Sequence, residues 1–534
     1  MVRSDVMKPT SPATSLTSWV QFIELAEPSL KDNTADADRL LHALGSSLGL
    51  DMGRPIADWR LLRSLPGTLR ETAYRVRVVL FHDTRNAFLV DVLHPEDPEP
   101  VWGVAVDLGT TRIVVRLIDL ASNTVCGETS FDNPQMTIGP DILSRVHHAC
   151  SVDGGLEYLQ RVVIEGLQRA IEELCRAKGS DPARVFLVSV SGNTTMSHLF
   201  LGLSPYSLIR EPYIPVMNRF PIVPATDIGL KLRSTALVYV FPNIGSYFGG
   251  DLVSGILYAG LHRREQTVLM VDVGTNAEVV LGNASWMMAC AGAAGPALEG
   301  GVSKMGMMAG PGAIDRVRID SNTGEMRYHT IGDQPPKGIC GSGIIDLAAC
   351  LFRKGFIDIR GKFVASACGD RLRELDGMAA YCIVEAAESA TGEPLYLTQA
   401  DLDSLIRSKA AMYTILETLT AAVGMRPEEL ESVWIAGTFG MFIDPVSAIT
   451  IGMIPDLPLE RYRAIGNSSL EGATLVLVQP EAMSEIPRIQ ENITYMELNV
   501  NVDFMNRFSA AKFVPHTDLS RFPSVSIHKR FLSI

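Results

Sequence analysis

The chain has 534 residues, 47% of them hydrophobic and 20% charged, and its net charge is −13. That length exceeds a single hydrophobic core, so we expect roughly three to five structural units. The acidic balance argues against a general binder of nucleic acid or of anionic membranes. The N-terminus lacks an apolar signal core, and charged, glycine and proline residues interrupt the most membrane-like stretch, 433–457. We therefore expect a cytoplasmic enzyme that does not act at a membrane or on nucleic acid.

The cysteines show no C-x-x-C pair and no metal-ligand spacing; they are Cys126, Cys150, Cys175, Cys290, Cys340, Cys350, Cys368 and Cys382. Reduced thiols in the core are therefore the favoured interpretation. A packed thiol is favoured over a redox role at Cys340, which has no second cysteine nearby in the sequence.

The first hundred residues indicate a tail and a small module. Residues 1–15 are rich in Ser, Thr and Pro and predict a disordered tail. Within 16–50, the stretch from Asn33 to Leu44 predicts a helix with its leucines on one face. Residues 51–100 predict a small α+β module, in which a short polar helix precedes the strands YRVRVVLFH and NAFLVDVL. An acidic, proline-rich stretch closes the module, and the next unit begins at Trp102.

The next unit opens with VAVDLGTTRIVV, an apolar strand that enters a tight turn at Asp107. Gly109 lets the turn close against an oxygen, and Thr110, Thr111 and the turn N–H groups can donate hydrogen bonds to it. The Asp107 carboxylate is left to face a metal ion or a water molecule. One such turn by itself is as compatible with an ordinary hairpin as with a phosphate site.

Two strand-turn-helix junctions follow along the chain. VFLVSVSGNTTMSHLFLGLSP at 185–205 predicts a buried strand, a turn at Asn193 and a helix. Such a junction directs N–H groups to the carboxyl edge of a sheet, where ligands bind, although a capped helix without a ligand fits the spacing as well. The next segment, ALVYVFPNIGSYFGGDLVSGILYAG, places Asp251 at the start of a helix, where an N-cap aspartate is usually structural.

The Asp107 pattern returns in LMVDVGTNAEVV, 165 residues further on, with Asp272 at the matching position. Gly274, Thr275 and Asn276 take the places of the first turn's glycine and threonines. Because the whole strand-turn-strand unit is repeated, the sequence predicts a duplicated fold that holds one polyphosphate between its halves. Asp107 and Asp272 are the expected metal-facing carboxylates.

Glycine-rich segments then supply further candidates. ACAGAAGPALEGG contains Glu299, which could meet ribose hydroxyls or cap a turn. GICGSGIIDLAACLFRKG places Gly341 and Ser342 in a turn before an apolar helix, a site for a phosphate or a hinge. ESVWIAGTFGMFIDP predicts a buried strand followed by a turn on which a nucleotide could lie flat; this turn is Gly437, Thr438, Phe439 and Gly440.

The trio of segments at Asp107, Asp272 and Gly437 resembles the phosphate-1, phosphate-2 and adenosine motifs of the actin-like ATPase superfamily. No G-x-x-x-x-G-K-(S/T) is present, which excludes a P-loop. The resemblance implies an α/β, ribonuclease H-like fold with two lobes, 101–265 and 266–534, around a cleft for ATP and Mg²⁺. It also makes Asp251 a candidate catalytic base, because the sugar-kinase branch has its base, an aspartate, at a comparable strand-to-helix junction.

Six longer segments narrow the resemblance: GNTTMSHLFLGL, FGGDLVSGIL, DVGTNAEVVLG, ACAGAAGPALEGG, GICGSGIIDL and AGTFGMFIDPVSAITIGMIPDLP. Together they closely resemble the ATP-dependent reductive activators of corrinoid proteins. LAEPSLKDNTADADRL is similar to that family's linker, and YMELNVNVDFMNRFSAAKFVPH at 495–516 to its closing segment. The resemblance implies ATP-driven return of a methyltransferase corrinoid protein from Co(II) to Co(I).

One departure concerns the electron path. Members of that family usually carry an iron–sulfur domain, but this sequence has no cysteine before Cys126 and none after Cys382. We therefore expect no bound cluster and a separate low-potential ferredoxin or other reductant as electron donor. A chaperone-like partner of a corrinoid protein and a fragment of a longer chain are alternatives.

Two other classes of function also remain open. A small-molecule kinase would use Asp251 as its base, and a noncatalytic nucleotide-sensing scaffold would close on ATP without turnover. The sequence leaves the oligomeric state undecided, with a homodimer as one option, and it does not identify the corrinoid protein.

Overall fold

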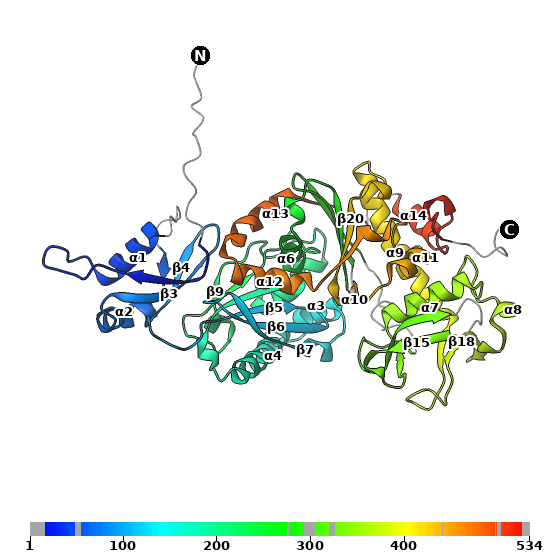
Figure 1. Cartoon of the computed structure of the whole chain (residues 1–534), viewed down its shortest axis with the longest axis horizontal. Helices are drawn as coiled ribbons and strands as arrows, with labels where there is room; N and C mark the ends of the chain where they lie inside the picture. The colour runs from blue at the N-terminus through cyan, green and yellow to red at the C-terminus, as the bar shows by residue number, and fades with distance from the viewer. Residues whose placement is uncertain are drawn as a thin grey trace, which may run out of the picture. The chain divides into compact units, whose positions relative to one another are not determined.

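The computed structural model describes residues 16–47, 55–274, 277–292, 305–319, 326–440, 442–496, 498 and 503–525. The chain divides into two compact units (Figure 1). The first unit contains the residues up to Tyr258 together with Ser469–Glu491, and the second contains Ala259–Ser468 and the residues from Asn492 on.

A small module opens the first unit. Its sheet has the order β1 (Val20–Glu24), β3 (Arg75–His82), β4 (Ala87–Leu93) and β2 (Ile56–Ala57). Helices α1 (Asp36–Ser47) and α2 (Trp59–Glu71) bury leucines at helical spacing, such as Leu40 with Leu44 and Leu61 with Leu65. The predicted strands are β3 and β4, and the helix predicted from Asn33 to Leu44 is α1. The segment 16–50, predicted as a linker, belongs to the same module, because β1 pairs with β3 and α1 packs into the module's core.

A six-stranded sheet forms the centre of the first unit. Its order is β7 (Thr124–Asp132), β6 (Arg112–Asp119), β5 (Trp102–Leu108), β8 (Val185–Gly192), β10 (Leu237–Val240) and β9 (Val223–Pro224). The helices are α3 (Ile142–Ser151), α4 (Gly155–Ala177), α5 (Thr194–Leu201), α6 (Gly250–Ala259) and α12 (Ser468–Val478). Strand β5 is antiparallel to β6 and parallel to β8, and all three are rich in buried β-branched residues.

The second unit repeats this arrangement. Its six-stranded sheet has the order β21 (Tyr462–Gly466), β20 (Ser432–Ala436), β11 (Val268–Val273), β12 (Ala277–Gly282), β13 (Met287–Gly292) and β22 (Ile493–Tyr495). Strand β11 is antiparallel to the following β12 and parallel to β20, as β5 is to β6 and β8. The predicted duplication of an α/β fold is therefore confirmed.

Two three-stranded sheets complete the second unit. They are β15 (Met326–Thr330), β14 (Ala313–Ile319) and β16 (Gly338–Ile339), and β17 (Leu372–Leu375), β18 (Met378–Val384) and β19 (Leu395–Thr398). The helices are α7 (Gly341–Arg353), α8 (Ala365–Cys368), α9 (Gln399–Ala422), α10 (Gly437–Gly440), α11 (Pro445–Thr450) and α14 (Phe504–Ala511). Helix α13 (Ile486–Asn492) belongs to the first unit except for its last residue.

Several details differ from the expectation. The predicted turn 437–440 is the short helix α10, and Asp251 lies inside the first turn of α6 instead of at its N-cap. Cys126 is half-buried and Cys150 is exposed, whereas the other six thiols are buried as predicted. In the part of the chain that the structure describes, no helix has the length and apolarity needed to cross a membrane.

Candidate functional site

The first predicted phosphate turn joins β5 to β6. Asp107 is half-buried near the end of β5, and it lies beside Ser191 of β8 in parallel register. A side chain at Gly109 would place its Cβ 2.2 Å from the carbonyl oxygen of Arg112, so this tight turn requires glycine. Thr110 and Thr111 complete the turn and are half-buried, which leaves their hydroxyls within reach of a ligand.

Two asparagines brace this turn. The Asn193 side-chain amide donates to the Thr110 hydroxyl at 3.0 Å, while its carbonyl oxygen accepts from the Met196 N–H and caps α5. Asn133 donates to the Gly109 carbonyl at 2.9 Å. Asn193 thus contacts the Asp107 turn directly, which the sequence did not predict, and Asn133 is a second supporting residue that its sequence context did not reveal.

Helix α5 also carries a buried histidine. The Nε2 atom of His198 accepts from the Val216 N–H at 3.1 Å, so we assign the proton to Nδ1, which faces the Thr194 carbonyl at 2.7 Å. Burial lowers the pKa of His198, which favours this neutral form. His198 therefore holds the loop that contains Val216 against α5. Its neutral form, with the proton on Nδ1, makes both of these structural hydrogen bonds.

Asp251 lies in the first turn of α6, and its Oδ1 accepts from the Leu252 N–H at 2.9 Å. The two preceding glycines are required by packing, because a Cβ at Gly249 would lie 2.3 Å from the Asn193 Cα and one at Gly250 would lie 2.5 Å from the Phe241 Cβ. The N-terminal turn of α6 is therefore seated directly against the Asn193 junction. Asp251 is half-buried, which leaves it accessible as a candidate base.

The second predicted turn follows β11. Asp272 is half-buried and lies opposite Ala436, the last residue of β20, in parallel register. Gly437 has a φ of 84°, and a Cβ there would lie 2.9 Å from Oδ1 of Asp272. The structure thus brings the Asp272 strand and the start of the predicted adenosine motif together, with glycine required at the contact.

The remaining candidates of this unit are only partly described. Gly274 directly follows β11 and is half-buried. Thr275, Asn276 and Glu299 lie outside the described residues, as do the side chains of Thr438 and Phe439. Gly440 closes α10, and a Cβ there would lie 2.5 Å from Cγ2 of Ile435.

Gly341 and Ser342 open α7, as predicted, but the Ser342 hydroxyl is used structurally. It is buried and donates to the Asp315 carbonyl at 3.0 Å. A Cβ at Gly343 would lie 2.3 Å from the Ile314 carbonyl oxygen, so this end of α7 is pressed against β14. A hinge or packing role for the Gly-Ser-Gly sequence agrees with these contacts better than a phosphate contact through the Ser342 hydroxyl.

An arginine that sequence reasoning missed ties α7 to the segment after the adenosine motif. Arg318 donates to Asp346 of α7 at 2.8 Å and to Asp444, the N-cap of α11, also at 2.8 Å. Asp346 is buried and also accepts from the Val317 N–H. Because Asp444 follows α10 by only four residues, this bridge restrains the segment that leaves the candidate nucleotide motif.

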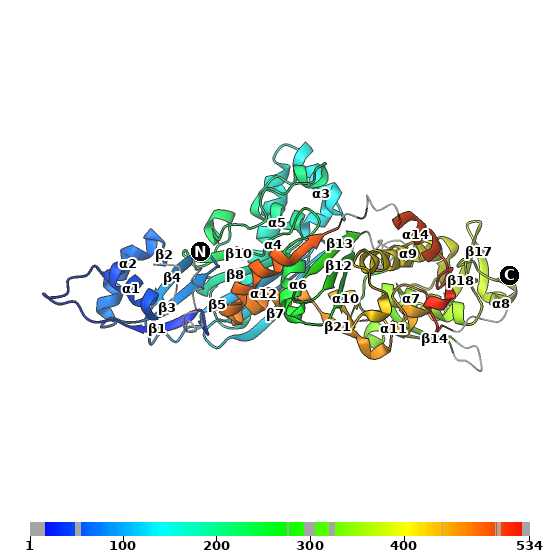
Figure 2. The ribbon, with the colours of Figure 1, turned by 90° about the horizontal axis from the view of Figure 1, so that it is seen from above.

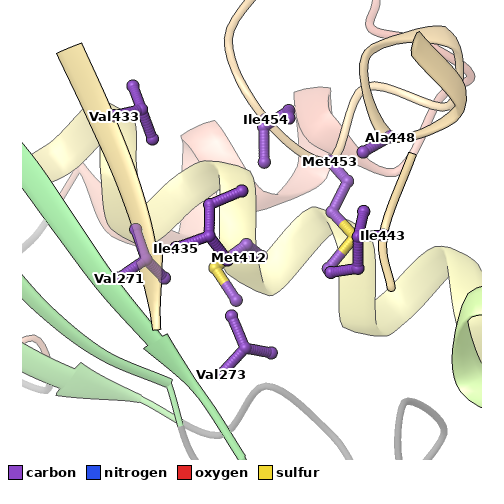
Figure 3. A pocket seen from close by; sticks show the side chains of 9 residues that line it. All are labelled: Val271, Val273, Met412, Val433, Ile435, Ile443, Ala448, Met453 and Ile454. Carbon is purple, nitrogen blue, oxygen red and sulfur yellow. The ribbon is translucent and has the colours of Figure 1, made fainter. Parts of the chain in front are cut away.

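A small apolar cavity lies behind the Asp272 turn (Figure 3). It encloses about 10 Å³ and is lined by Val271, Val273, Met412, Val433, Ile435, Ile443, Ala448, Met453 and Ile454. This volume is barely enough for one water molecule, and the lining offers no polar partner for one. The cavity therefore belongs to the packing that supports β11 and β20, and the nucleotide candidates lie at the ends of these strands.

The described ranges include a carboxylate at each of the two predicted phosphate turns, Asp107 and Asp272. No group of three or more His, Cys, Asp or Glu side chains is arranged there to hold a metal ion. Mg²⁺ does not need one, because it is usually bound through one or two carboxylates together with water and substrate phosphates. Asp107 and Asp272 remain suitable candidates of this kind.

Comparisons with known proteins identify three consecutive regions. The family model described as the C-terminal domain of RACo, the ASKHA domain, matches residues 266–526. The RACo middle region matches residues 102–264, and the RACo linker region matches residues 12–99. Together these matches span the small module and both large sheets, and the ASKHA match confirms the actin-like fold.

Individual relatives agree with these matches. The corrinoid activation enzyme RamQ of Eubacterium limosum is 33% identical over 423 residues, which cover 77% of this chain and 70% of that enzyme. The [Co(II) methylated amine-specific corrinoid protein] reductase of Methanosarcina barkeri is 24% identical over 425 residues, covering 74% of this chain and 73% of the reductase. The solved structure of a reductive activator for a corrinoid, iron–sulfur protein superposes with a TM-score of 0.85 at 37% identity, covering 98% of this chain and 82% of that one.

Proposed function

Because the chain belongs to the RACo family of reductive activators of corrinoid proteins, we propose that it uses ATP to return a methyltransferase corrinoid protein from Co(II) to Co(I). The observation that carries this proposal is the repeated strand-turn pattern, in which Asp107 and Asp272 are the second-last residues of equivalent strands in two similar sheets, within a chain that belongs to this family. The substrate of the reaction is the Co(II) corrinoid protein, and ATP provides the driving force.

The chain's own residues suit ATP with magnesium. We assign Gly109, Thr110 and Thr111 of the first unit to phosphate contacts, and likewise Gly274, Thr275 and Asn276 of the second, since Asp-x-Gly-Thr sequences offer N–H groups and hydroxyls to anions. The absence of a side chain at Gly437 leaves open the space beside Asp272 that a Cβ would fill. Asp107 and Asp272 would supply hard oxygen ligands of the kind that Mg²⁺ prefers. When bound, Mg²⁺ would neutralise phosphate charge.

Reduction of cobalt needs one electron, and we assign its supply to a separate low-potential ferredoxin or another reductant. Each 30 mV by which the donor falls short costs about 0.7 kcal/mol for one electron. Binding of the Co(II) protein can offset that deficit if it removes a cobalt ligand and thereby raises the potential. The nucleotide can drive the cycle if its bound states differ in affinity for the corrinoid protein.

The small module is our candidate for part of the corrinoid-protein contact. Ile56, Trp59 and Leu62 are 53%, 64% and 39% exposed, which is high for large apolar side chains. Trp59 and Leu62 are three residues apart on α2 and so share one helix face. Exposed aromatic and aliphatic side chains of this kind are common at protein interfaces.

The experiment is to mix ATP, a reductant and a Co(II) corrinoid protein and to follow Co(I) absorbance with and without this chain. We expect faster Co(I) formation with the chain and phosphate release that the Co(II) protein stimulates but its methylated form does not. Equal rates of Co(I) formation, with phosphate release unchanged by the corrinoid protein, would contradict the proposal. A phosphorylated metabolite in a substrate screen would instead favour a small-molecule kinase.

A further inference from the structure

Three buried serines connect Asp107 to the first turn of α6. Ser191 lies on β8, Ser254 on α6 and Ser469 on α12, and each is at most 5% exposed. The Ser469 hydroxyl lies 2.8 Å from Oδ1 of Asp107 and 3.0 Å from the Ser191 hydroxyl. The Ser191 and Ser254 hydroxyls are 2.6 Å apart, and Ser254 Oγ lies 2.9 Å from the Asp251 carbonyl oxygen. A continuous line of hydrogen-bonding atoms therefore joins the two candidate catalytic segments.

The backbone explains why these serines meet. Parallel pairing of β5 with β8 places Asp107 beside Ser191. Helix α12 can approach α6 closely because Gly472 has no side chain; a Cβ there would lie 2.2 Å from the Ser254 carbonyl oxygen. Figures 1 and 2 both show α12 alongside α6 and β5. The contact of α12 with α6 thus brings Ser469 to the end of β5.

The four contacts of this chain share only three hydroxyl protons. Each serine hydroxyl donates one hydrogen bond, whereas an ionised Asp107 and the Asp251 carbonyl can only accept. In the structure Ser469 donates to Asp107 and Ser254 donates to the Asp251 carbonyl, so both end acceptors have a donor. The Ser191 proton can then fill only one of the two contacts between serines. Which contact lacks a proton therefore depends on how strongly Asp107 needs a donor.

We propose that Ser469, Ser191 and Ser254 are positioning residues that transmit the occupancy of Asp107 to the helix that carries Asp251. When a cation or a water molecule satisfies Oδ1 of Asp107, Ser469 turns to donate to Ser191 and Ser191 donates to Ser254, so that one directed chain of hydrogen bonds ends at the Asp251 carbonyl. Each proton stays on its own oxygen, so no proton transfer takes place. This inference rests on the proposed function, which places ATP with magnesium at Asp107.

The chain of Ser469, Ser191 and Ser254, called the relay below, can affect α6 because it is buried. Hydrogen bonds are strengthened in a low-dielectric interior, and linked hydroxyls polarise one another, so a chain in which every hydroxyl donates in the same direction strengthens the bond from Ser254 to the Asp251 carbonyl. A serine that donates to a carbonyl three or four residues earlier tends to bend its helix. A stronger bond from Ser254 would therefore adjust the first turn of α6, where Asp251 lies.

The test is hydrogen exchange of the α6 backbone amides in the full chain, with and without Mg·ADP, in the wild type and in Ser191→Ala. The matched control is Ser189→Ala, which removes a buried hydroxyl from the same face of β8. The Ser189 hydroxyl has no hydrogen-bond partner among the described residues. Ser469→Ala is a second variant that cuts the chain at its Asp107 end, and thermal unfolding verifies that each variant folds.

We expect Mg·ADP to change exchange in α6 of the wild type and of Ser189→Ala, and the change to be at least threefold smaller in Ser191→Ala and Ser469→Ala. ATP turnover should fall about tenfold in the latter two, on the scale of coupling between sites. A wild-type response in folded Ser191→Ala, or no α6 response in a wild type that binds Mg·ADP, would overturn the relay alone. Failure of the wild type to bind Mg·ADP would overturn the proposed function and the relay with it.

Discussion

Asp272 and Gly437 are the residue pair on which the candidate nucleotide site of the second unit depends. The Asp272 carboxylate is half-buried at the end of β11, and Gly437 leaves the space next to its Oδ1 free of a side chain. An equally sized neutral side chain should fit the same position without disturbing the strand. Replacing Asp272 by asparagine therefore removes the negative charge while the packing around it is kept.

We predict that Asp272→Asn reduces ATP hydrolysis by about a hundredfold, the scale on which one main electrostatic contributor is lost. The fold should be retained, since an asparagine differs from the aspartate mainly in charge. Phosphate release at saturating ATP measures the effect, and thermal unfolding serves as the structural control. Undiminished phosphate release from the folded variant would remove Asp272 from the mechanism.

The contact between α9 and the segment after α14 depends on a buried lysine. Lys409 of α9 is fully buried, and its Nζ donates to the carbonyls of Phe513 and Pro515, the latter at 2.7 Å. Burial lowers the pKa of Lys409 well below its ordinary value, and a neutral amine still has two N–H groups for the two carbonyls. One side chain therefore satisfies two backbone acceptors of the closing segment.

We predict that Lys409→Met lowers the free energy of unfolding by about 2–4 kcal/mol, because both carbonyls lose their donor in a buried setting. Arg407→Met, an exposed position on the same helix, is the control and should change stability by less than about 0.5 kcal/mol. Denaturant unfolding measures both variants. Equal stability of the two would show that the lysine contributes no net stabilisation.

The buried Lys409 should also make the stability of the fold depend on pH. Between the lowered native pKa of Lys409 and its ordinary unfolded value, the unfolded chain binds more protons than the native one. The wild type should therefore gain stability as the pH rises through that window, and Lys409→Met should lack this gain. Denaturant unfolding at several alkaline pH values tests the difference.

Sequence patterns predicted those parts of the fold and site that depend only on residues close together in the chain. The Asp107 and Asp272 strands, the order of strand, turn and helix around Asn193 and the glycine-rich start of α6 were predicted correctly because each pattern spans only a few residues. The serine chain could not be found in this way, since Ser469 contacts Asp107 across 362 residues. The 437–440 segment was predicted as a turn because its glycines disfavour a helix, yet it forms the single turn of α10.

At the scale of the whole molecule, the thiols are distributed over both units and mostly buried. Cys175 lies in the first unit, and Cys290 and Cys368 lie in the second. Burial raises the pKa of Cys175 and of Cys368 to about 11 and that of Cys290 to about 12. An iron–sulfur cluster needs several thiolates close together, so both the placement and the protonation of these residues oppose one.

We therefore predict that this 534-residue chain, purified without oxygen, contains no stoichiometric iron and depends on an added electron donor. With ATP and a Co(II) corrinoid protein but no reductant, phosphate release should continue while Co(I) absorbance stays flat, because no electron is available to cobalt. Adding a low-potential ferredoxin should start Co(I) formation. Iron analysis and the visible spectrum provide the independent measurement, and several irons per dimer with a visible charge-transfer band would contradict the prediction. Two subunits that share a cluster would give that result, and the electron path would then run through the chain itself.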